Sequence, residues 1–246
     1  MFEIINIKSC NKDINNKRTE ISKLLMLKSA NIKGTSITKI SVEDLNIMFR
    51  LYDQVFFNNW FKDSFRGNIK FSLSKRMTKS AGITLCPKNI AKMDQSQLEI
   101  EIRIGVDFIL HYDIIEGGKS VGGIRTNNSV EALQLVLEHE LCHVIEFIFF
   151  SKSSCSGSRF KTLANNLFGH TDSYHRLPSY RQIAHKKMGL NIGDAVSFKF
   201  DGKCYCGILY NIYKRAIVMV KDKNGLFMDN KGSRYSKFYV PLKNLE

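Results

Sequence analysis

Apolar side chains recur at intervals of three and four residues in two long stretches of the chain, residues 41–57 and residues 129–150. The apolar positions are Leu45, Met48, Phe49, Tyr52, Val55 and Phe56 in the first stretch, and Leu133, Val136, Leu137, Val144, Ile145 and Ile148 in the second. This spacing predicts two helices that each bury an apolar face. A serine begins the first stretch and an asparagine precedes the second, each with an acidic residue three positions later, as in a capping box.

Other segments have patterns typical of strands and turns. LEIEIRI, within residues 97–110, alternates strictly between apolar and charged side chains, which predicts a strand with one buried face. NIKFSLS and AGITLC, earlier in the chain, are predicted to be shorter strands. GGKSVGGIRTNN, residues 117–128, is expected to be a loop before the second long helix. RFKTLANNLF, residues 159–168, is expected to be a short helix that Gly169 ends.

Composition changes along the chain and suggests three parts. Residues 1–40 are rich in Lys, Asn, Ile and Ser, and we expect a loosely attached leader there, with one helical stretch. Residues 41–185 mix the predicted helices and strands and are expected to form an α+β domain. In residues 190–246, short β-prone runs are divided by Asp-Gly, Lys-Asn-Gly and Lys-Gly turns. About five strands in so short a segment predict a small β-barrel.

The charge of the chain is strongly basic and unevenly distributed. Lys and Arg exceed Asp and Glu by 14, and residues 186–246 alone hold 12 basic and 5 acidic side chains. Such a balance favours polyanionic partners and predicts binding that weakens with salt. The basic residues of this segment alternate with Phe and Tyr, which can stack on bases, so we expect a nucleic acid, DNA, as a partner. Solubilising lysines around an aromatic core are the alternative interpretation.

The cysteines and the apolar runs bear on the cellular compartment. The six cysteines are Cys10, Cys86, Cys142, Cys155, Cys204 and Cys206. They include no C-x2-C pair and no dense framework, so reduced thiols are expected. The apolar runs are shorter than the roughly 20 residues of a membrane span, and MFEIINIKSCNK lacks the features of a signal peptide. We therefore expect an intracellular protein, cytoplasmic or nuclear, that is neither secreted nor in a membrane.

Residues 139–143 read His-Glu-Leu-Cys-His, an HExxH motif within the second predicted helix. Histidines four residues apart lie on one helix face, so His139 and His143 can bind one Zn²⁺ ion. Glu140 lies beside them, where a carboxylate can take a proton from an attacking water as general base. In so apolar a helix, two imidazoles and a carboxylate would be costly to bury without partners. Histidines satisfied by ordinary hydrogen bonds are the structural alternative.

A catalytic zinc site needs a third protein ligand. We expect His170, because Gly169 permits a tight turn that brings its imidazole inward after the short helix. His175, and more remotely Asp172, are the substitutes. His111 and His185 are expected to have no role at the metal.

Four further residues near the motif have more limited roles. Tyr174 is either a hydrogen-bond donor to a reaction oxyanion or a packing residue. Glu138 and Glu146 either orient a ligand histidine or lie at solvated or ion-paired surface positions. Cys142 is expected only to fill space.

HELCHVIEF, with the preceding FFNNWFKDSFRGNIKFSLSKRMTKSAGIT, resembles the SprT-like, or Spartan-type, metalloprotease domain. The shared features are a helix ending in paired Phe, a strand with an Arg-Met-Thr segment and an Ala-Gly, and then HExxH. The resemblance covers roughly residues 41–180. It implies a zincin-like α+β fold, with helices on a small sheet, and zinc-dependent hydrolysis of a protein substrate. In the best-known members the substrate is crosslinked or bound to DNA, which implies a role in DNA repair.

The chain departs from that family at one place. Many members carry their third histidine in an H-G-x-x-F/W segment, where this chain has Ser156-Gly157-Ser158-Arg159-Phe160. The later Gly-His-Thr segment resembles a variant branch in which His170 replaces that ligand. Residues 190–246 resemble an SH3-like barrel of the Tudor or KOW kind.

Three functions are consistent with these observations. The first is a zinc metallopeptidase with His139, His143 and His170 as metal ligands and Glu140 as the catalytic base. The second is a non-catalytic, nucleic-acid-binding adaptor with a structural or vestigial zinc site. The third is a metal-dependent hydrolase of a substrate that is not a peptide.

Overall fold

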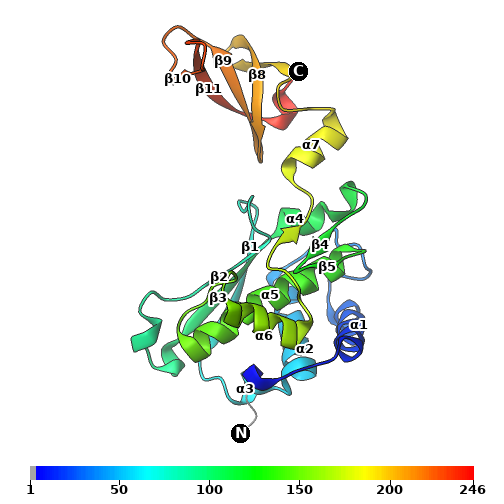
Figure 1. Cartoon of the computed structure of the whole chain (residues 1–246). Helices are drawn as coiled ribbons and strands as arrows, with labels where there is room; N and C mark the ends of the chain where they lie inside the picture. Colours follow the sequence, from blue (N-terminus) through cyan, green and yellow to red (C-terminus); the bar gives the residue numbers. More distant parts are fainter. Residues whose placement is uncertain (1–3) are drawn as a thin grey trace. The chain divides into compact units, whose positions relative to one another are not determined.

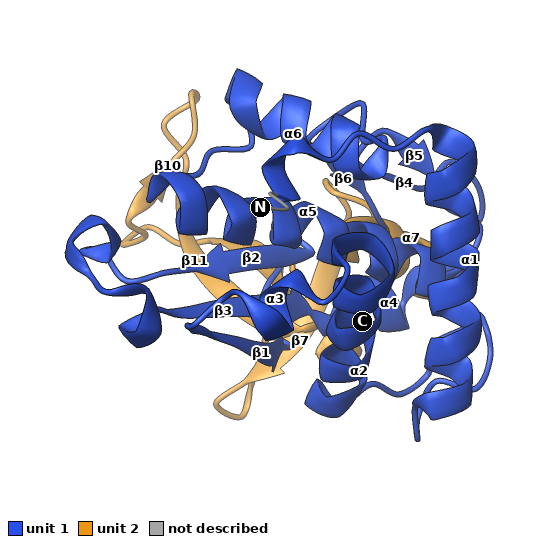
Figure 2. Cartoon of the chain, turned by 90° about the horizontal axis from the view of Figure 1, so that it is seen from below, with its two compact units in different colours: residues 1–177 blue, residues 178–246 orange. Residues whose placement is uncertain are grey.

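The computed structural model describes residues 4–246 and has the predicted α+β character, with helices and strands in both halves of the chain (Figure 1). The chain divides into two compact units, residues 1–177 and residues 178–246 (Figure 2). Each has its own hydrophobic core.

Unit 1 combines helices with two small sheets. Its α-helices are α1 (Asn11–Lys28), α2 (Val42–Phe57), α3 (Trp60–Asp63), α4 (Val106–Leu110), α5 (Ser129–Phe150) and α6 (Ser158–Phe168). Its strands are β1 (Asn68–Ser74), β2 (Gly82–Leu85), β3 (Glu99–Gly105), β4 (Ser120–Val121), β5 (Ile124–Arg125) and β6 (His175–Arg176). Short 3-10 turns cover Ile4–Asn6, Ile90–Lys92, Gln95–Gln97 and Tyr112–Ile114.

Both long helices begin where the sequence predicts. Ser41 and Asp44 form a capping box at α2, in which each side chain accepts a hydrogen bond from the backbone N–H of the other residue. At α5 the Asn128 side chain accepts a hydrogen bond from the Glu131 backbone. These caps satisfy N–H groups that have no partner within the helix. The two starting points are therefore confirmed.

The larger sheet has the order β1-β3-β2, with β1 parallel and β2 antiparallel to β3. The alternation predicted for β3 is confirmed, because Ile100, Ile102 and Ile104 are fully buried. The strand ends where the chain enters α4, directly after Gly105. Strand β2 lies at one edge of this sheet and packs against α5.

Helix α5 runs through the interior of unit 1 and is buried on nearly every face. It contacts β2, α6, α4, β4 and α1 (Figure 1). A helix with apolar side chains on most of its faces is stable in water only when other elements cover it, and α5 is covered. Among residues 4–246, no helix is long and apolar enough to cross a membrane.

The expectation of a loosely attached leader is wrong for residues 11–28. Helix α1 buries Ile14, Ile21 and Leu25 in the core of unit 1. Its Arg18 forms an ion pair with the fully buried Glu138 of α5, at 2.6 Å. The sequence predicted a helical stretch here but not its packing, because the contacts of α1 with the core depend on only a few apolar positions and one arginine.

The segment 117–128 forms a hairpin where the sequence predicts a loop. Strands β4 and β5 pair antiparallel around Gly122 and Gly123, which have φ of +57° and +79°. Positive φ at two successive turn residues strongly favours glycine. The hairpin also pairs with β6, opposing Val121 to His175, and the Gly122 carbonyl accepts hydrogen bonds from the backbone of Thr171 and Asp172. It therefore fixes the segment that carries His175.

Unit 2 contains α7 (Tyr180–Met188) and the strands β7 (Ala195–Phe200), β8 (Lys203–Ile212), β9 (Arg215–Lys221), β10 (Phe227–Met228) and β11 (Arg234–Pro241), followed by a 3-10 turn at Leu242–Asn244. The antiparallel order is β10-β11-β9-β8-β7. Ser197 of β7 exchanges two backbone hydrogen bonds with Glu246 beyond β11. This sheet is compatible with the predicted small barrel. The predicted boundary is too late, because Ala184 of α7 packs in the core of unit 2.

The ion pair between α1 and α5 gives a stability prediction. Arg18→Ala should lower the free energy of unfolding by about 3–5 kcal/mol, because it leaves the Glu138 carboxylate buried without its cation. Urea denaturation measures this difference. Lys23→Ala, at an exposed position of the same helix, is the control and should change stability by no more than about 0.5 kcal/mol. Equal effects of the two substitutions would contradict the structural role of Arg18.

Candidate metal centre

The HExxH motif brings two imidazoles together on one face of α5. The Nε2 atoms of His139 and His143 lie 3.2 Å apart. Two nitrogens that are each 2.0–2.1 Å from one tetrahedral zinc ion are separated by about 3.3 Å. Phe160 of α6 packs against both rings, with centroids 4.8 and 4.5 Å away. The pair is therefore spaced as metal ligands are and is held by packing.

Burial keeps these histidines neutral. It lowers the pKa of His139 to about 2, with further lowering by the nearby His175 and His143, and it lowers the pKa of His143 to about 4. Neutral imidazole is the form that binds a metal. The two rings are thus in the binding form across the neutral pH range.

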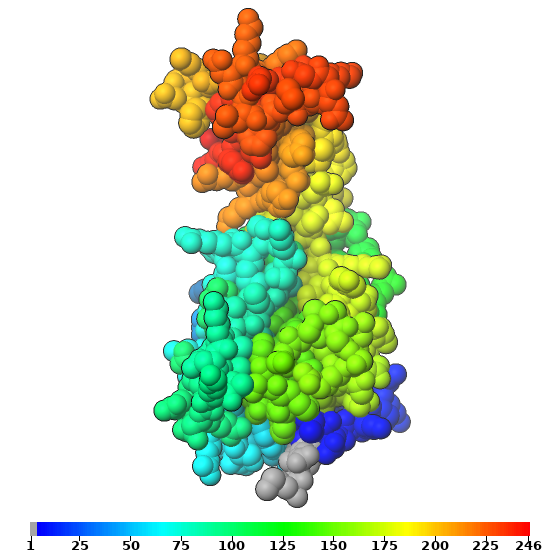
Figure 3. Space-filling model, turned by 60° about the vertical axis from the view of Figure 1, so that its left-hand side comes forward, coloured from blue at the N-terminus to red at the C-terminus, as the bar shows by residue number. Residues whose placement is uncertain are grey.

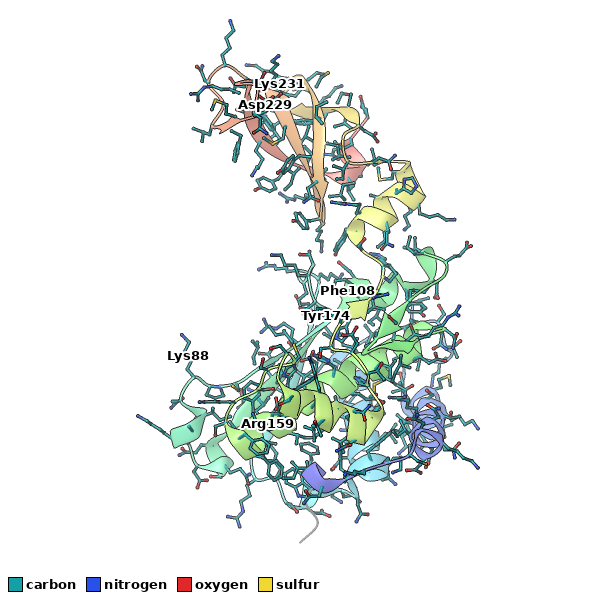
Figure 4. All side chains as sticks on the ribbon, viewed as in Figure 1. Lys88, Phe108, Arg159, Tyr174, Asp229 and Lys231 are labelled. Atoms are coloured by element: carbon teal, nitrogen blue, oxygen red, sulfur yellow. The ribbon has the colours of Figure 1, made fainter. Side chains whose placement is uncertain are left out.

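The tautomer of His143 is set by its neighbours. Ser153 Oγ donates a hydrogen bond to the Glu146 carboxylate at 2.6 Å, so it can only accept from Nδ1–H of His143, which also lies at 2.6 Å. The lone pair of His143 is then on Nε2, facing His139. Arg159 of α6 (labelled in Figure 4) donates to the other Glu146 oxygen at 2.7 Å. Relays of this kind orient ligand histidines at metal sites.

Glu140 lies between α5 and the edge strand β2. One of its carboxylate oxygens accepts a hydrogen bond from the Thr84 hydroxyl at 2.7 Å. Burial raises its pKa to about 7, and the Thr84 hydrogen bond offsets only part of the rise. The carboxylate fits because residue 82 is glycine, where a Cβ atom would lie 2.5 Å from Glu140 Oε1. Glu140 can therefore accept and return a proton near neutral pH.

His175 joins this cluster from β6. Its ring centroid is 4.7 Å from that of His139, and single ligand atoms of His139, Glu140 and His175 all lie within 4.8 Å of one another. Burial lowers the pKa of His175 to about 4, so this ring is also neutral. Among the described residues, no hydrogen-bond partner is found for the buried Nδ1 atoms of His139 and His175.

His170, the expected third ligand, is placed elsewhere. It is buried, and Gly169 does make the left-handed turn that brings it inward, at φ +67°. However, its Nε2 lies 2.9 Å from the Glu138 carboxylate, and its Nδ1 faces Gly122. Neither group of potential metal ligands found among residues 4–246 includes it. His175, and not His170, lies near His139 in a group of potential ligands.

Glu138 is buried and paired instead of solvated. Besides His170, it accepts hydrogen bonds from Arg18 at 2.6 and 2.8 Å and from Tyr52 at 2.7 Å. Burial alone would raise its pKa, but the Arg18 charge and the hydrogen bonds from Arg18 and His170 outweigh burial and lower it. The surface interpretation is wrong for Glu146 as well, which is 1% exposed. Both carboxylates hold the helix that carries the histidines.

A second group of possible ligands contains a cysteine. Single ligand atoms of His139, His143 and Cys155 lie within 4.8 Å of one another. Cys155 lies one residue before Ser156, in the connector between α5 and α6. Sequence reasoning missed it, because an isolated cysteine in a Ser-rich turn has no characteristic spacing to a motif.

The cluster opens into a cleft of about 520 Å³ within unit 1. Residues from β2, α5, the connector and the segment around β6 line it. Figure 3 shows the molecular surface, coloured along the sequence. Tyr174 and Phe108 (Figure 4) also line the cleft. Tyr174 is 76% exposed, so its interpretation as a packing residue is wrong.

The remaining candidates lie outside the cluster. Asp172, His111, His185 and the Cys204–Cys206 pair belong to no group of potential ligands among residues 4–246. Cys142 is buried within the motif but is also in neither group, which agrees with a space-filling role.

These donors fit zinc. Imidazole and thiolate are common zinc ligands, and the 3.2 Å spacing of the two Nε2 atoms is compatible with two ligands of one tetrahedral ion. The fold and the site thus define an α+β domain with a histidine-rich candidate metal centre on its buried helix.

The comparison with protein families agrees. The model of the SprT-like family matches residues 45–176, which include the whole cluster, and the chain belongs to this family. The family is generally associated with zinc-dependent metallopeptidase activity. No curated protein and no solved structure matches the chain.

The ligand assignment predicts a difference between two neighbouring histidines. His175→Ala should bind zinc at least about tenfold more weakly than the unaltered chain, whereas His170→Ala should keep about one zinc per chain, because His170 serves Glu138. Metal analysis after dialysis against a weak chelator measures both. His185→Ala, on α7, is the control. Loss of zinc from His170→Ala alone would make His170 the third ligand after all.

Proposed function

We propose that the protein is a zinc-dependent metallopeptidase. The single observation that carries this proposal is the Glu140 carboxylate in one cluster with His139 and His175, beside the closely spaced pair His139 and His143. Membership of the SprT-like family supports it.

Each residue of the cluster has a distinct task in this reaction. His139, His143 and His175 would hold the ion. Zinc, when bound, polarises a peptide carbonyl and makes an attacking water more acidic. Glu140 takes the proton of that water and then gives it to the leaving amine. Thr84 holds the Glu140 carboxylate in position by its hydrogen bond of 2.7 Å.

An edge strand supports a peptide as the substrate. Strand β2 pairs with β3 on one side, and its residues Gly82, Ile83 and Thr84 line the cleft beside Glu140. An extended peptide can add to such an edge through main-chain hydrogen bonds, which do not depend on its side chains. Tyr174, exposed at the same cleft, would donate a hydrogen bond to the oxyanion of the reaction.

Substitution of Glu140, the residue that carries the proton, tests this mechanism. Glu140→Gln should keep about one zinc per chain and lower peptide hydrolysis by about 10²- to 10⁴-fold, because only the proton acceptor is removed. Hydrolysis of a fluorogenic casein reports the rate, and metal analysis reports the zinc. Glu20→Gln, at an exposed position of α1, should leave both unchanged.

The outcomes of this experiment separate the rival functions. Undiminished hydrolysis by Glu140→Gln would exclude Glu140 as the base. Zinc binding without hydrolysis of any peptide, in the unaltered chain, would favour either a structural zinc in an adaptor or a hydrolase of another substrate class.

We also propose that unit 2 binds DNA. Its register places Lys199, Lys221 and Lys237 on the face opposite to the buried Phe198 and Val218. Tyr239, on that same face, is 59% exposed. Lysines beside an exposed ring can neutralise phosphates and stack on a base. A protein attached to DNA is therefore the substrate that we propose for the metal centre.

The salt dependence of DNA binding tests this part. Replacing Lys199, Lys221 and Lys237 by Gln should reduce the slope of log K against log salt by about 1 for each lysine that no longer neutralises a phosphate. Fluorescence anisotropy with a labelled duplex measures it. The same three-charge change in unit 1, at the exposed Lys12, Lys23 and Lys28, is the control. Equal reductions would contradict a special role of unit 2.

A further inference from the structure

The connector between α5 and α6 is held by hydrogen bonds just before Cys155 and at Cys155 itself. Before it, Ser153 Oγ and the Ser154 backbone N–H donate hydrogen bonds to Glu146 of α5, at 2.6 and 3.2 Å. At Cys155 itself, the backbone carbonyl accepts a hydrogen bond of 2.6 Å from Ser173 Oγ. The position of the cysteine is therefore determined by contacts with two other segments.

These contacts bring the thiol to the histidine pair. Its Sγ lies within 4.8 Å of a ligand atom of both His139 and His143, and Cys155 is half-buried in the wall of the cleft. Ser173, which holds the Cys155 carbonyl, lies two residues before His175. The thiol and the third imidazole thus belong to linked segments and reach the same His139.

We propose that Cys155 is a fourth ligand of the metal centre and closes it. The inference rests on the proposed zinc site and adds to it a thiolate beside His139 and His143. Structural zinc sites have four protein ligands, whereas catalytic sites keep one position open, and thiolate is a preferred zinc ligand. When the Cys155 thiol loses its proton and binds, one water and one proton leave the site.

This ligand gives the centre two states. With Sγ bound, Cys155 would join His139 and His143, the two histidines whose ligand atoms lie within 4.8 Å of its sulfur, and would exclude the water from hydrolysis. With Sγ released, the three histidines remain and Glu140 can act. A reagent that alkylates the Cys155 sulfur would prevent it from binding the metal and would keep the centre in the state with Sγ released.

Cobalt substitution tests the proposal on the full chain. Thiolate bound to Co²⁺ gives an intense near-ultraviolet charge-transfer band, which imidazole and carboxylate ligands do not give. We expect this band in the unaltered protein and in Cys86→Ser, a control at another half-buried cysteine. We expect its loss in Cys155→Ser, with the visible d–d bands of bound cobalt retained.

The other outcomes of the cobalt experiment distinguish failure of the Cys155 proposal from failure of the metal centre itself. Visible d–d bands without the charge-transfer band in the unaltered protein, or a band that persists in Cys155→Ser, would overturn the role of Cys155 and leave the histidine site standing. Failure of the unaltered protein to bind cobalt or zinc would overturn the metal centre and this inference together.

Alkylation of the unaltered protein provides a test that needs no folded variant. Iodoacetamide should label Cys155 in metal-free protein, and added zinc should abolish that labelling while the exposed Cys10 and Cys204 stay reactive. Peptide mapping by mass spectrometry measures each site. Labelling of Cys155 that zinc does not change would overturn the proposal.

Discussion

Three carboxylates lie buried within nine residues of one helix, and the arrangement of unit 1 depends on how each of them is satisfied. Glu138, Glu140 and Glu146 are at most 2% exposed. A charge buried without a partner costs several kcal/mol, so each carboxylate requires polar groups from another part of the chain. Glu138 receives them from α1 and α2, Glu140 from β2, and Glu146 from α6 and the connector before it.

The same residue type takes different roles because these partners differ. Glu138 is paired with an arginine, which lowers its pKa, and it anchors α5 in the core. Glu146 also has an arginine and, through Ser153, orients His143. Glu140 accepts a side-chain hydrogen bond from the neutral Thr84 hydroxyl, which does not offset its burial, so its pKa is raised. Proton transfer near neutral pH requires a carboxyl whose pKa is raised in this way.

The ligands of the candidate centre come from separate parts of the chain and are linked through hydrogen bonds. The β4–β5 hairpin positions His175, Glu146 positions the connector that carries Cys155, and Ser173 joins the two segments. A change in any of these contacts would alter the ligand set without touching the HExxH motif. The centre is therefore a property of three segments folded around one helix.

The sequence alone determined the helix starts, the alternating strand β3, and the neighbouring placement of His139, Glu140 and His143. These depend on local periodicity and capping, which short segments carry by themselves. It favoured His170 over His175, because Gly169 permits a tight turn before His170, but local pattern says nothing of how far either ring lies from the motif. Only the tertiary structure separates them: His170 contacts the buried Glu138, and pairing of β6 with the hairpin places His175 near His139. The packing of α1 and the approach of Cys155 were likewise invisible, since long-range contacts define both.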